Sequence, residues 1–389
     1  MHQEGAMPYT SYTGSYLKTI KTPHGLMMGI RLCGSNPLGG KTKNSLALQG
    51  SRVQDFFMLA KRTNRKILVL WDSEPHVIVK QGKQSIFRWL NEHLRRFDID
   101  FKQLTFMSQN WAIEECYANW CKLNNTLEHE KFNVEFVWTS ARRFAETRIM
   151  KLDAYKGEKD THFTCMNGRN RGIRRLMQNE MDDMGFNKPE VKQKHITTYY
   201  YSLEEEINPI GQKEMVHRMR TKGHANPHSE ELKQTLLRSC VSFTQDFLQF
   251  EELNYNDSEL YGDWWKERCI SEKTLRNIYF AQPFILYSDP GAYNFLHEQG
   301  FQTFDGILFD ESFDSIEDDT LRLRAILSEL QRLLAMDIAD VQALVKSDAV
   351  VDVLIHNKKL LHTIGMLTKN TTLPDEQVIN SVYRGQANE

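Results

Sequence analysis

An arginine-rich turn between an apolar strand and a helix is the first feature of this sequence that could do chemistry. In FTCMNGRNRGIRRLM a short apolar run leads into a turn with two glycines, and a helical pattern begins directly afterwards. The unpaired N–H groups and the dipole of a helix N-terminus favour an anion there. The guanidinium groups of Arg169, Arg171 and Arg174 would add forked donors that suit a diphosphate. The alternative is a solvated helix face on which these arginines pair with Glu180 or Asp182.

A Ser-Glu-Lys triplet at the start of a later helix is the second set of polar residues with a chemical use. Ser271 has the side chain and the position of an N-cap, and Glu272 and Lys273 follow it in the first turn, ahead of the apolar strand PFILY. A carboxylate at that place can hold two ribose hydroxyls, and the lysine can reach a phosphate. The helix dipole alone would explain Glu272 but not Lys273, because a cation is unfavourable at a helix N-terminus.

Short apolar runs alternate with amphipathic stretches along most of the chain, and this pattern predicts the elements that carry both sets. Such alternation indicates mostly parallel sheets covered by helices on both faces, which is the α/β class. The predicted strands cover residues 25–33, 66–71, 103–108, 134–139, 162–166, 196–201, 239–247, 283–287 and 306–309. The predicted helices cover residues 49–62, 85–97, 113–123, 173–184, 274–280, 293–298 and 321–334, with more to about 367 and near 375–382.

The length of the chain and a break in this alternation predict its division into domains. At 389 residues the chain is too long for one ordinary core. The alternation stops at a polar, basic stretch near residues 154–160 and then starts again. We therefore expect two Rossmann-like domains, residues 1–155 and 156–320, followed by C-terminal helices in residues 321–389.

Both sets of polar residues lie in stretches that resemble the C-terminal half of GT-B-type glycosyltransferases. The pattern S/T-E-K-T-x-x-x-I-x-x-x-x-P-F-I, followed by a Pro-Gly turn and L-x-E-x-G-F-x-T-F-D, is similar to that of α1,3-fucosyltransferase-like enzymes. Similar sequences occur among proteins of large tailed bacteriophages. The matching stretches, residues 163–176 and 270–305, cover about 50 residues. The resemblance implies a GT-B-like fold that binds a nucleotide-sugar donor in its C-terminal domain.

The resemblance also implies roles for single residues. The residues that would contact the donor are Asn167, Arg169, Arg171, Arg174, Ser271, Glu272 and Lys273. The first four would meet the diphosphate, and the Glu-Lys pair would meet the ribose and a phosphate. The chain departs from the family at two places. Ser271 stands where threonine is usual, and the segment VSFTQD, residues 241–246, lacks the glutamate of a Thr-Glu-Thr-like segment that relatives often carry.

The catalytic base is expected in the N-terminal domain, which the resemblance makes the acceptor domain. Asp72, Glu74 and His76 follow the strand KILVLW directly, and ligands of parallel sheets lie at the carboxyl ends of the strands. A carboxylate there would deprotonate an acceptor hydroxyl as the sugar carbon is attacked. We favour Glu74 as this base and Asp72 after it; the alternative is an ordinary polar turn. The helices of residues 321–389 would pack back on this domain.

Two further patterns could bind a nucleotide or a metal ion. The loop Gly34–Thr42 is similar to a P-loop, but Ser35 stands where the first glycine of G-x-x-x-x-G-K-[ST] belongs. Asp98 and Asp100 form a D-x-D triplet, which binds a metal and a diphosphate in GT-A transferases, but a turn acid is ordinary at that place. A GT-B site needs no metal, because arginines and a helix N-terminus stabilise the leaving diphosphate. We therefore expect no cofactor and no metal site.

Composition limits the compartment and the acceptor. No apolar run approaches the ~20 residues of a membrane helix, and the N-terminal residues lack the order of a signal peptide. We therefore expect no membrane partner and a cytoplasmic location, which would be the host cytoplasm if a phage encodes the chain. The similarity to phage proteins is compatible with a hydroxymethylated DNA base as acceptor, and a cell-surface glycan or a protein is equally open. The net charge of −2 argues mildly against tight DNA binding.

Two alternative functions also fit parts of this sequence pattern. A non-catalytic protein could retain the nucleotide site as a ligand sensor, which the missing glutamate favours. A nucleic-acid-binding module could use the basic segment of residues 141–176, which contains ten Lys and Arg residues and only four acidic residues. Nucleic-acid binding would be salt-sensitive and would survive the substitution Glu272→Ala, whereas donor binding would not.

Overall fold

The chain folds into two compact units, and each unit contains a mostly parallel β-sheet. The computed structural model describes residues 16–22, 25–31, 50–71, 78–79, 84–138, 141, 144, 152–166, 172–198, 230–246 and 268–372. The first unit comprises Met1–Arg142, Leu253–Cys269 and Gly365–Glu389, and the second comprises Arg143–Glu252 and Ile270–Ile364. The α/β class with two parallel-sheet units is confirmed. The predicted boundaries 1–155, 156–320 and 321–389 stay predictions.

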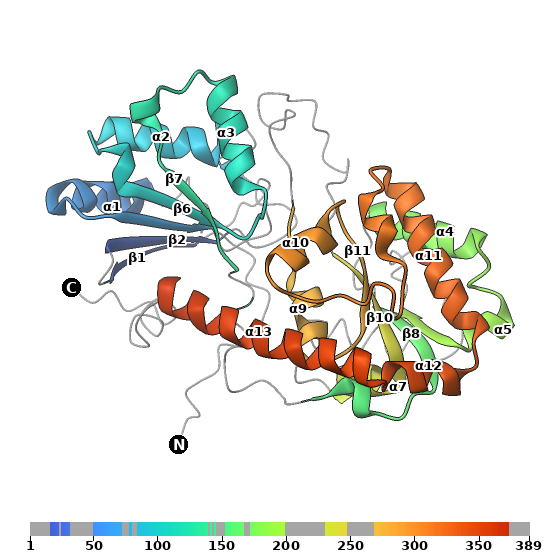
Figure 1. Ribbon diagram of the computed structural model, residues 1–389. Coiled ribbons are helices and arrows are strands. Elements are labelled where there is room, and N and C mark those ends of the chain that lie inside the picture. The colour runs from blue at the N-terminus through green and yellow to red at the C-terminus, as the bar shows by residue number, and fades with distance from the viewer. Residues whose placement is uncertain are drawn as a thin grey trace. The chain divides into compact units, whose positions relative to one another are not determined.

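The first unit contains a five-stranded sheet in the order β1-β2-β3-β6-β7 (Figure 1). Its strands are β1 (Tyr16–Thr22), β2 (Gly25–Arg31), β3 (Ile67–Trp71), β6 (Leu104–Ser108) and β7 (Asn133–Phe136). The last four are parallel neighbours; among them β3 (ILVLW) is a continuous apolar run and every residue of β6 is buried, as is typical of parallel strands. Strand β1 was not predicted, because its alternating polar residues form an antiparallel edge strand on β2.

Three helices connect these strands and lie together on one face of the sheet: α1 (Gly50–Thr63), α2 (Ile86–Arg96) and α3 (Ile113–Leu123). The strand order advances in one direction, so right-handed crossovers place every connecting helix on the same face, whereas helices on both faces were expected. Aromatic residues from all three helices form the core here, among them Phe57, Phe87 and Trp120. A short hairpin of β4 (Ile78–Val79) and β5 (Gln84–Ser85) precedes α2.

The second unit contains a four-stranded, fully parallel sheet in the order β11-β10-β8-β9. Its strands are β8 (Thr161–Met166), β9 (His195–Thr198), β10 (Ser239–Gln245) and β11 (Phe284–Tyr287). The chain passes from β8 to one side at β9 and then returns to the other side of β8 at β10. The strand predicted at residues 306–309 is wrong. Asp305 and Phe309 form only an isolated bridge around Gly306, whose φ of 67° makes a tight turn.

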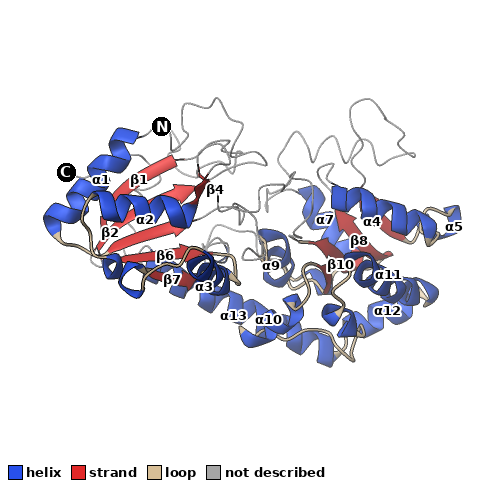
Figure 2. Cartoon of the chain, turned by 90° about the horizontal axis from the view of Figure 1, so that it is seen from above, coloured by secondary structure: helices blue, strands red, loops and turns tan. Residues whose placement is uncertain are grey.

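Helices cover both faces of this second sheet (Figure 2). The helices of this unit are α4 (Gly172–Asp183), α5 (Pro189–Lys192), α7 (Glu230–Arg238), α9 (Glu272–Tyr279), α10 (Ala292–Glu298), α11 (Asp319–Ala335) and α12 (Ile338–Val345). A last helix, α13 (Asp348–Thr372), belongs to this unit as far as Ile364, and its remaining residues are assigned to the first unit. The Arg324 guanidinium of α11 binds Glu180 of α4, and the Lys194 ammonium donates to Leu334 O, so α11 packs beside α4. In α13 the Asn357 amide pairs with the backbone of Gln302 in the same unit.

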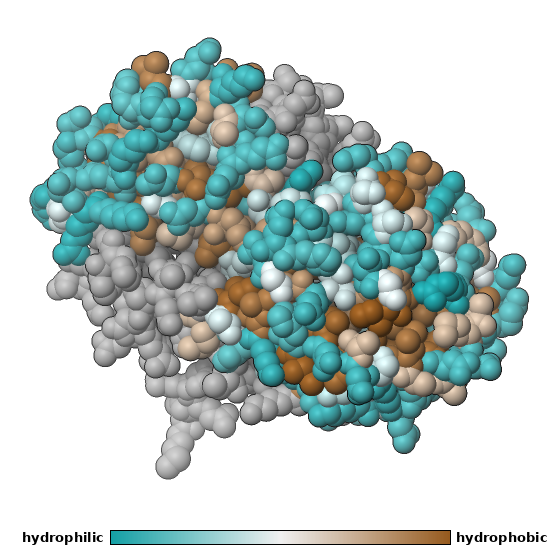
Figure 3. Space-filling view, in the orientation of Figure 1, coloured by the Kyte–Doolittle hydropathy of each residue, from teal (hydrophilic) through white to brown (hydrophobic). Residues whose placement is uncertain are grey.

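The surface and the cysteines agree with the composition of the chain. On the face drawn in Figure 3, hydrophilic residues make up most of the described surface. Among the described helices, none has both the length and the apolar character needed to cross a membrane. All five cysteines in the described part of the chain are buried and carry free thiols.

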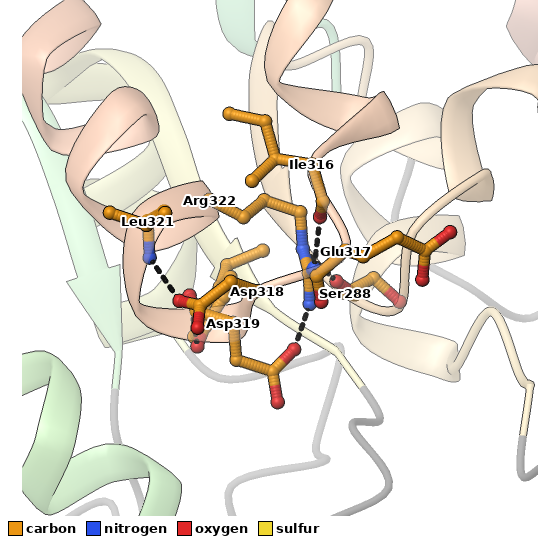
Figure 4. A network of polar contacts seen from close by, with 8 residues as sticks. Ser288, Ile316, Glu317, Asp318, Asp319, Leu321 and Arg322 are labelled. Atoms are coloured by element: carbon orange, nitrogen blue, oxygen red, sulfur yellow. Dashed lines mark hydrogen bonds and ion pairs between the residues drawn. The ribbon is translucent and has the colours of Figure 1, made fainter.

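One buried arginine ties the end of β11 to the beginning of α11 (Figure 4). Only 1% of Arg322 is exposed. Its Nε donates to Ser288 O at 2.9 Å, and its Nη1 donates to Ile316 O at 2.5 Å and to Glu317 O at 3.2 Å. Its Nη2 binds the carboxylate of Asp319. The guanidinium is therefore satisfied on every side, and its position depends on three backbone carbonyls as well as one charge.

Replacing this arginine should be costly. We expect Arg322→Met to lower the free energy of unfolding by about 3–5 kcal/mol, because it leaves buried carbonyls and one carboxylate without their donor. Arg238→Met is the matched control, since Arg238 and its partner Asp160 are each 53% exposed, and it should cost less than about 1 kcal/mol. Equilibrium unfolding in urea measures both. Equal losses in the two variants would contradict the role assigned to Arg322.

Candidate functional site

The carboxyl ends of β8 and β10 are where the strand order of the second sheet reverses. These strands are direct neighbours, yet the chain leaves β8 in one direction and reaches β10 from the other. In open parallel sheets the crevice that binds ligands opens at such a reversal, outside the carboxyl ends. The helices that connect parallel strands run opposite to them, so the N-termini of α4 and α9 lie at this same edge. The first turn of α4 and the Ser-Glu-Lys triplet at the start of α9 therefore lie at one edge of one sheet.

The beginning of α9 is attached to the end of β10 by a single carboxylate. Asp246 directly follows β10, and its Oδ2 accepts hydrogen bonds from Ser271 N at 2.9 Å and from the Thr274 hydroxyl at 2.5 Å. Ser271 caps the helix as predicted, since its hydroxyl accepts a hydrogen bond from Lys273 N at 3.2 Å. The Lys273 ammonium lies 3.4 Å from Gln245 O. These contacts fix the first turn of α9 at the edge of the sheet.

Asp246 was not among the residues predicted from the sequence. Only 4% of it is exposed, and its Oδ1 has no hydrogen-bond partner in the part of the chain that the structure describes. Burial raises the pKa of Asp246 above its ordinary value, against the opposing effects of the Lys273 ammonium and the hydrogen bonds from Ser271 and Thr274. Asp246 is the last residue of VSFTQD, the segment that was singled out only for a missing glutamate.

The sheet beneath α9 is polar near the same edge. The Asn277 amide donates to the Thr244 hydroxyl of β10 at 2.6 Å, and Asn277 is fully buried. Its Oδ1 and the buried Thr164 hydroxyl of β8 have no partner among the described residues. Buried polar atoms without partners are costly, and in native proteins they commonly mark a ligand, a water molecule or a functional site.

The structure brings some of the predicted donor residues together and does not describe others. Ser271, Glu272 and Lys273 form the start of α9, and the last two are half-buried. The backbone of Arg174 lies in the first turn of α4, but its side chain is outside the described part. The predicted residues that lie wholly outside the described ranges are Asp72, Glu74, Asn167, Arg169 and Arg171. Two elements still constrain them, because β3 ends at Trp71 and β8 ends at Met166.

The alternative that the arginines of α4 pair along their own helix can be examined at Glu180. Its carboxylate is bound by Arg324 of α11, with Nε 2.6 Å from Oε2 and Nη2 3.3 Å from Oε1. Such a two-fold contact occupies both oxygens of the carboxylate. Glu180 thus connects α4 to α11. Its charge is balanced by Arg324, so no arginine of α4 is needed as its partner.

The D-x-D triplet has a structural explanation. The exposed Asp98 carboxylate pairs with Lys61 at 2.7 Å, and this contact lowers the pKa of Asp98 below its ordinary value. Asp100 caps the following short helical turn by accepting from Lys102 N at 2.9 Å. Nowhere in the described ranges do three or more His, Cys, Asp or Glu side chains form a group that could hold a metal ion. The P-loop-like segment Gly34–Thr42 lies outside those ranges.

Substitutions of Asp246 should separate its charge from its hydrogen bonds. Asp246→Ala should lower the free energy of unfolding by about 1–3 kcal/mol, because it leaves Ser271 N and the Thr274 hydroxyl without an acceptor. Asp246→Asn keeps an acceptor and cannot ionise. A raised pKa means that the native protein binds the proton more tightly than the unfolded chain, so wild-type stability falls as the pH rises between the ordinary and the raised pKa.

Stability measured by urea unfolding across the acidic range tests this expectation. The stability of Asp246→Asn relative to wild type should increase as the pH rises through that window. A relative stability that decreases with rising pH would show that the pKa of Asp246 is lowered instead.

Comparisons with known proteins give matches among solved structures alone. No family model matches the sequence, and no curated protein matches it. A mutant of T4 phage BGT in complex with UDP-glucose is similar with a TM-score of 0.35 and 9% identity, over 84% of this chain and 77% of that chain. The α,α-trehalose 6-phosphate synthase of Burkholderia multivorans is similar with a TM-score of 0.34 and 11% identity, over 88% of this chain and 78% of that one. Both scores are low, so the fold and the site rest on the topology and the contacts of this chain itself.

Proposed function

We propose that the protein is a nucleotide-sugar-dependent glycosyltransferase of the GT-B-like type, with its donor site at the carboxyl edge of the second sheet. The observation that carries the proposal is the fixed first turn of α9, which holds Glu272 and Lys273 beside the strand-order reversal. A helix N-terminus and a lysine at that edge suit a phosphate, and the adjacent carboxylate suits ribose hydroxyls. The arginines that follow β8 in the sequence would act at the same edge.

Each donor residue has a role that follows from its chemical type. Glu272 would accept hydrogen bonds from the ribose, and Lys273 would bind a phosphate oxygen. Ser271 would keep the helix start in place. Asn167, Arg169, Arg171 and Arg174 would bind the diphosphate and stabilise the charge that it gains as it leaves. Because these cations supply that stabilisation, the proposal requires neither a metal ion nor another cofactor.

The chemical step moves the sugar to a hydroxyl of the acceptor, a glycan or a hydroxymethylated DNA base. Glu74, or Asp72 in its place, would take the proton from the acceptor hydroxyl. The acceptor oxygen would bond to the anomeric carbon of the sugar, and the bond from that carbon to the diphosphate would break. The nucleoside diphosphate would leave with the bonding electrons. Both acids follow β3 directly, and the carboxyl end of a parallel strand suits a catalytic residue.

Donor binding is the first measurement. The melting temperature in a panel of UDP-, GDP-, ADP- and CMP-sugars should rise for one nucleotide, because a ligand that binds only the native state stabilises it. Glu272→Gln, Lys273→Ala and Arg169→Ala should each weaken binding by about 10- to 100-fold, since each removes a charged contact. The control Lys188→Ala removes an exposed lysine of the same unit and should bind as wild type. Binding should persist in excess EDTA.

Two outcomes would contradict this function. If no nucleotide sugar raises the melting temperature, the proposal that the protein binds a nucleotide-sugar donor is contradicted. Salt-sensitive binding of DNA that survives Glu272→Ala would favour the nucleic-acid-binding alternative in its place.

Transfer should depend on the acid after β3, once a donor is known. We expect Glu74→Gln to lower kcat by about 10²–10⁴-fold while donor affinity stays within about two-fold, because general-base catalysis contributes that much and the substitution leaves the donor site intact. Asp72→Asn is the matched comparison and should keep most of the activity. Release of the free nucleoside diphosphate measures turnover. If Asp72→Asn loses the activity and Glu74→Gln keeps it, Asp72 and not Glu74 is the catalytic base.

A further inference from the structure

Arg276 shares a helix face with the two charged residues predicted to bind the donor. It follows Glu272 by four residues and Lys273 by three, and residues at these spacings are neighbours on a helix surface. All three side chains are half-buried, whereas Thr274 and Asn277 are buried on the side that faces the sheet. This face of α9 therefore carries two cations and one carboxylate at the carboxyl edge of the sheet.

Helix geometry leads us to expect that the Arg276 side chain extends toward the beginning of its helix. Side chains of α-helices tilt toward the N-terminus, so a long arginine side chain extends over the preceding turn. The carboxylates of Glu272 and Asp246 both act on this guanidinium electrostatically, and Asp246 lies at the end of β10. The guanidinium therefore lies within electrostatic range of the carboxylate that follows β10.

Arg276 is desolvated without being hydrogen-bonded to the described residues. Its Nε is buried and has no partner, and no ion pair to its guanidinium is found in the part of the chain that the structure describes. Burial lowers the pKa of Arg276 below its ordinary value, and the two carboxylates oppose this effect. An arginine remains charged under these conditions, so the protein holds a partly dehydrated cation whose donors find no acceptor among those residues.

A structural arginine in the same unit shows what a satisfied guanidinium looks like. Arg322 is at least as buried, yet its nitrogens donate to three backbone carbonyls and to Asp319. Leaving a buried charge without such partners costs stability, and proteins retain such a group where a ligand supplies the missing partner. The partner of a forked cation beside a lysine and a helix N-terminus is an anion with several oxygens.

We propose that Arg276 is an anion-binding residue of this site and that it takes a phosphate group of a nucleoside diphosphate. The proposal deepens the function proposed above and rests on it for the nucleoside. A phosphate oxygen would accept from the guanidinium while Lys273 binds the same diphosphate from the preceding turn. Arg276 would then contribute a positive charge from α9, whereas the other arginines proposed to bind the diphosphate come from the segment after β8.

Calorimetric titration with inorganic pyrophosphate and with the nucleoside diphosphates UDP, GDP and ADP tests this role. Arg276→Gln should weaken pyrophosphate binding by about 10- to 100-fold, and Arg276→Lys should lose less because it keeps the charge. Arg238→Gln is the matched control, because it removes an exposed arginine of the same unit that pairs with Asp160. Without ligand, the melting temperature of Arg276→Gln should equal or exceed that of wild type, since the substitution removes an unsatisfied buried charge.

The outcomes separate this inference from the proposed function. Arg276→Gln binding pyrophosphate as tightly as wild type would overturn the inference, even if nucleotide sugars still bind. A large fall in the melting temperature of ligand-free Arg276→Gln would also overturn it, because Arg276 would then be a structural partner of Asp246 and Glu272. Loss of pyrophosphate binding in a stable Arg276→Gln supports the inference, and it does so even if no nucleotide sugar binds and the transferase fails.

Discussion

The candidate site depends on the hydrogen bonds that the Asp246 carboxylate accepts from the start of α9. This carboxylate accepts a backbone N–H from the residue that caps α9 and a hydroxyl from the first turn of the same helix. A strand end and a helix start that are far apart in sequence are thereby held together at one edge of the sheet. Without this contact, Glu272 and Lys273 would be ordinary charged residues of a helical first turn. With it, their positions are set relative to β10.

Most elements of the fold could be predicted because their signals are local. Continuous apolar runs identified β3 and β11, and the predicted serine cap of α9 identified where that helix begins. The missed elements lack such signals. The polar strand β1 depends on β2 for its hydrogen bonds, and α7 is a short helix directly after a long polar stretch.

The site was only partly predictable, because its chemistry depends on contacts between distant residues. Ser271, Glu272 and Lys273 were recognisable from their order in the sequence. Asp246 was not, because nothing in the segment VSFTQD shows that its acid meets a helix 25 residues later. The order of the strands was equally hidden. A sequence of alternating strands and helices fits several orders, and only the reversal between β8 and β10 identifies the edge that suits a ligand.

The polar residues of α9 divide by helix face, and the division separates two kinds of role. Thr274 and Asn277 face the sheet and donate their hydrogen bonds to Asp246 and Thr244, which fixes the helix. Glu272, Lys273 and Arg276 lie on the half-buried face and are the charged groups of the helix start. A short helix with charges on the sheet side would not pack, and one without polar contacts to the sheet would not be held in register. The same eight residues therefore anchor the edge with one face, and the other face carries the charges on which the proposed anion site rests.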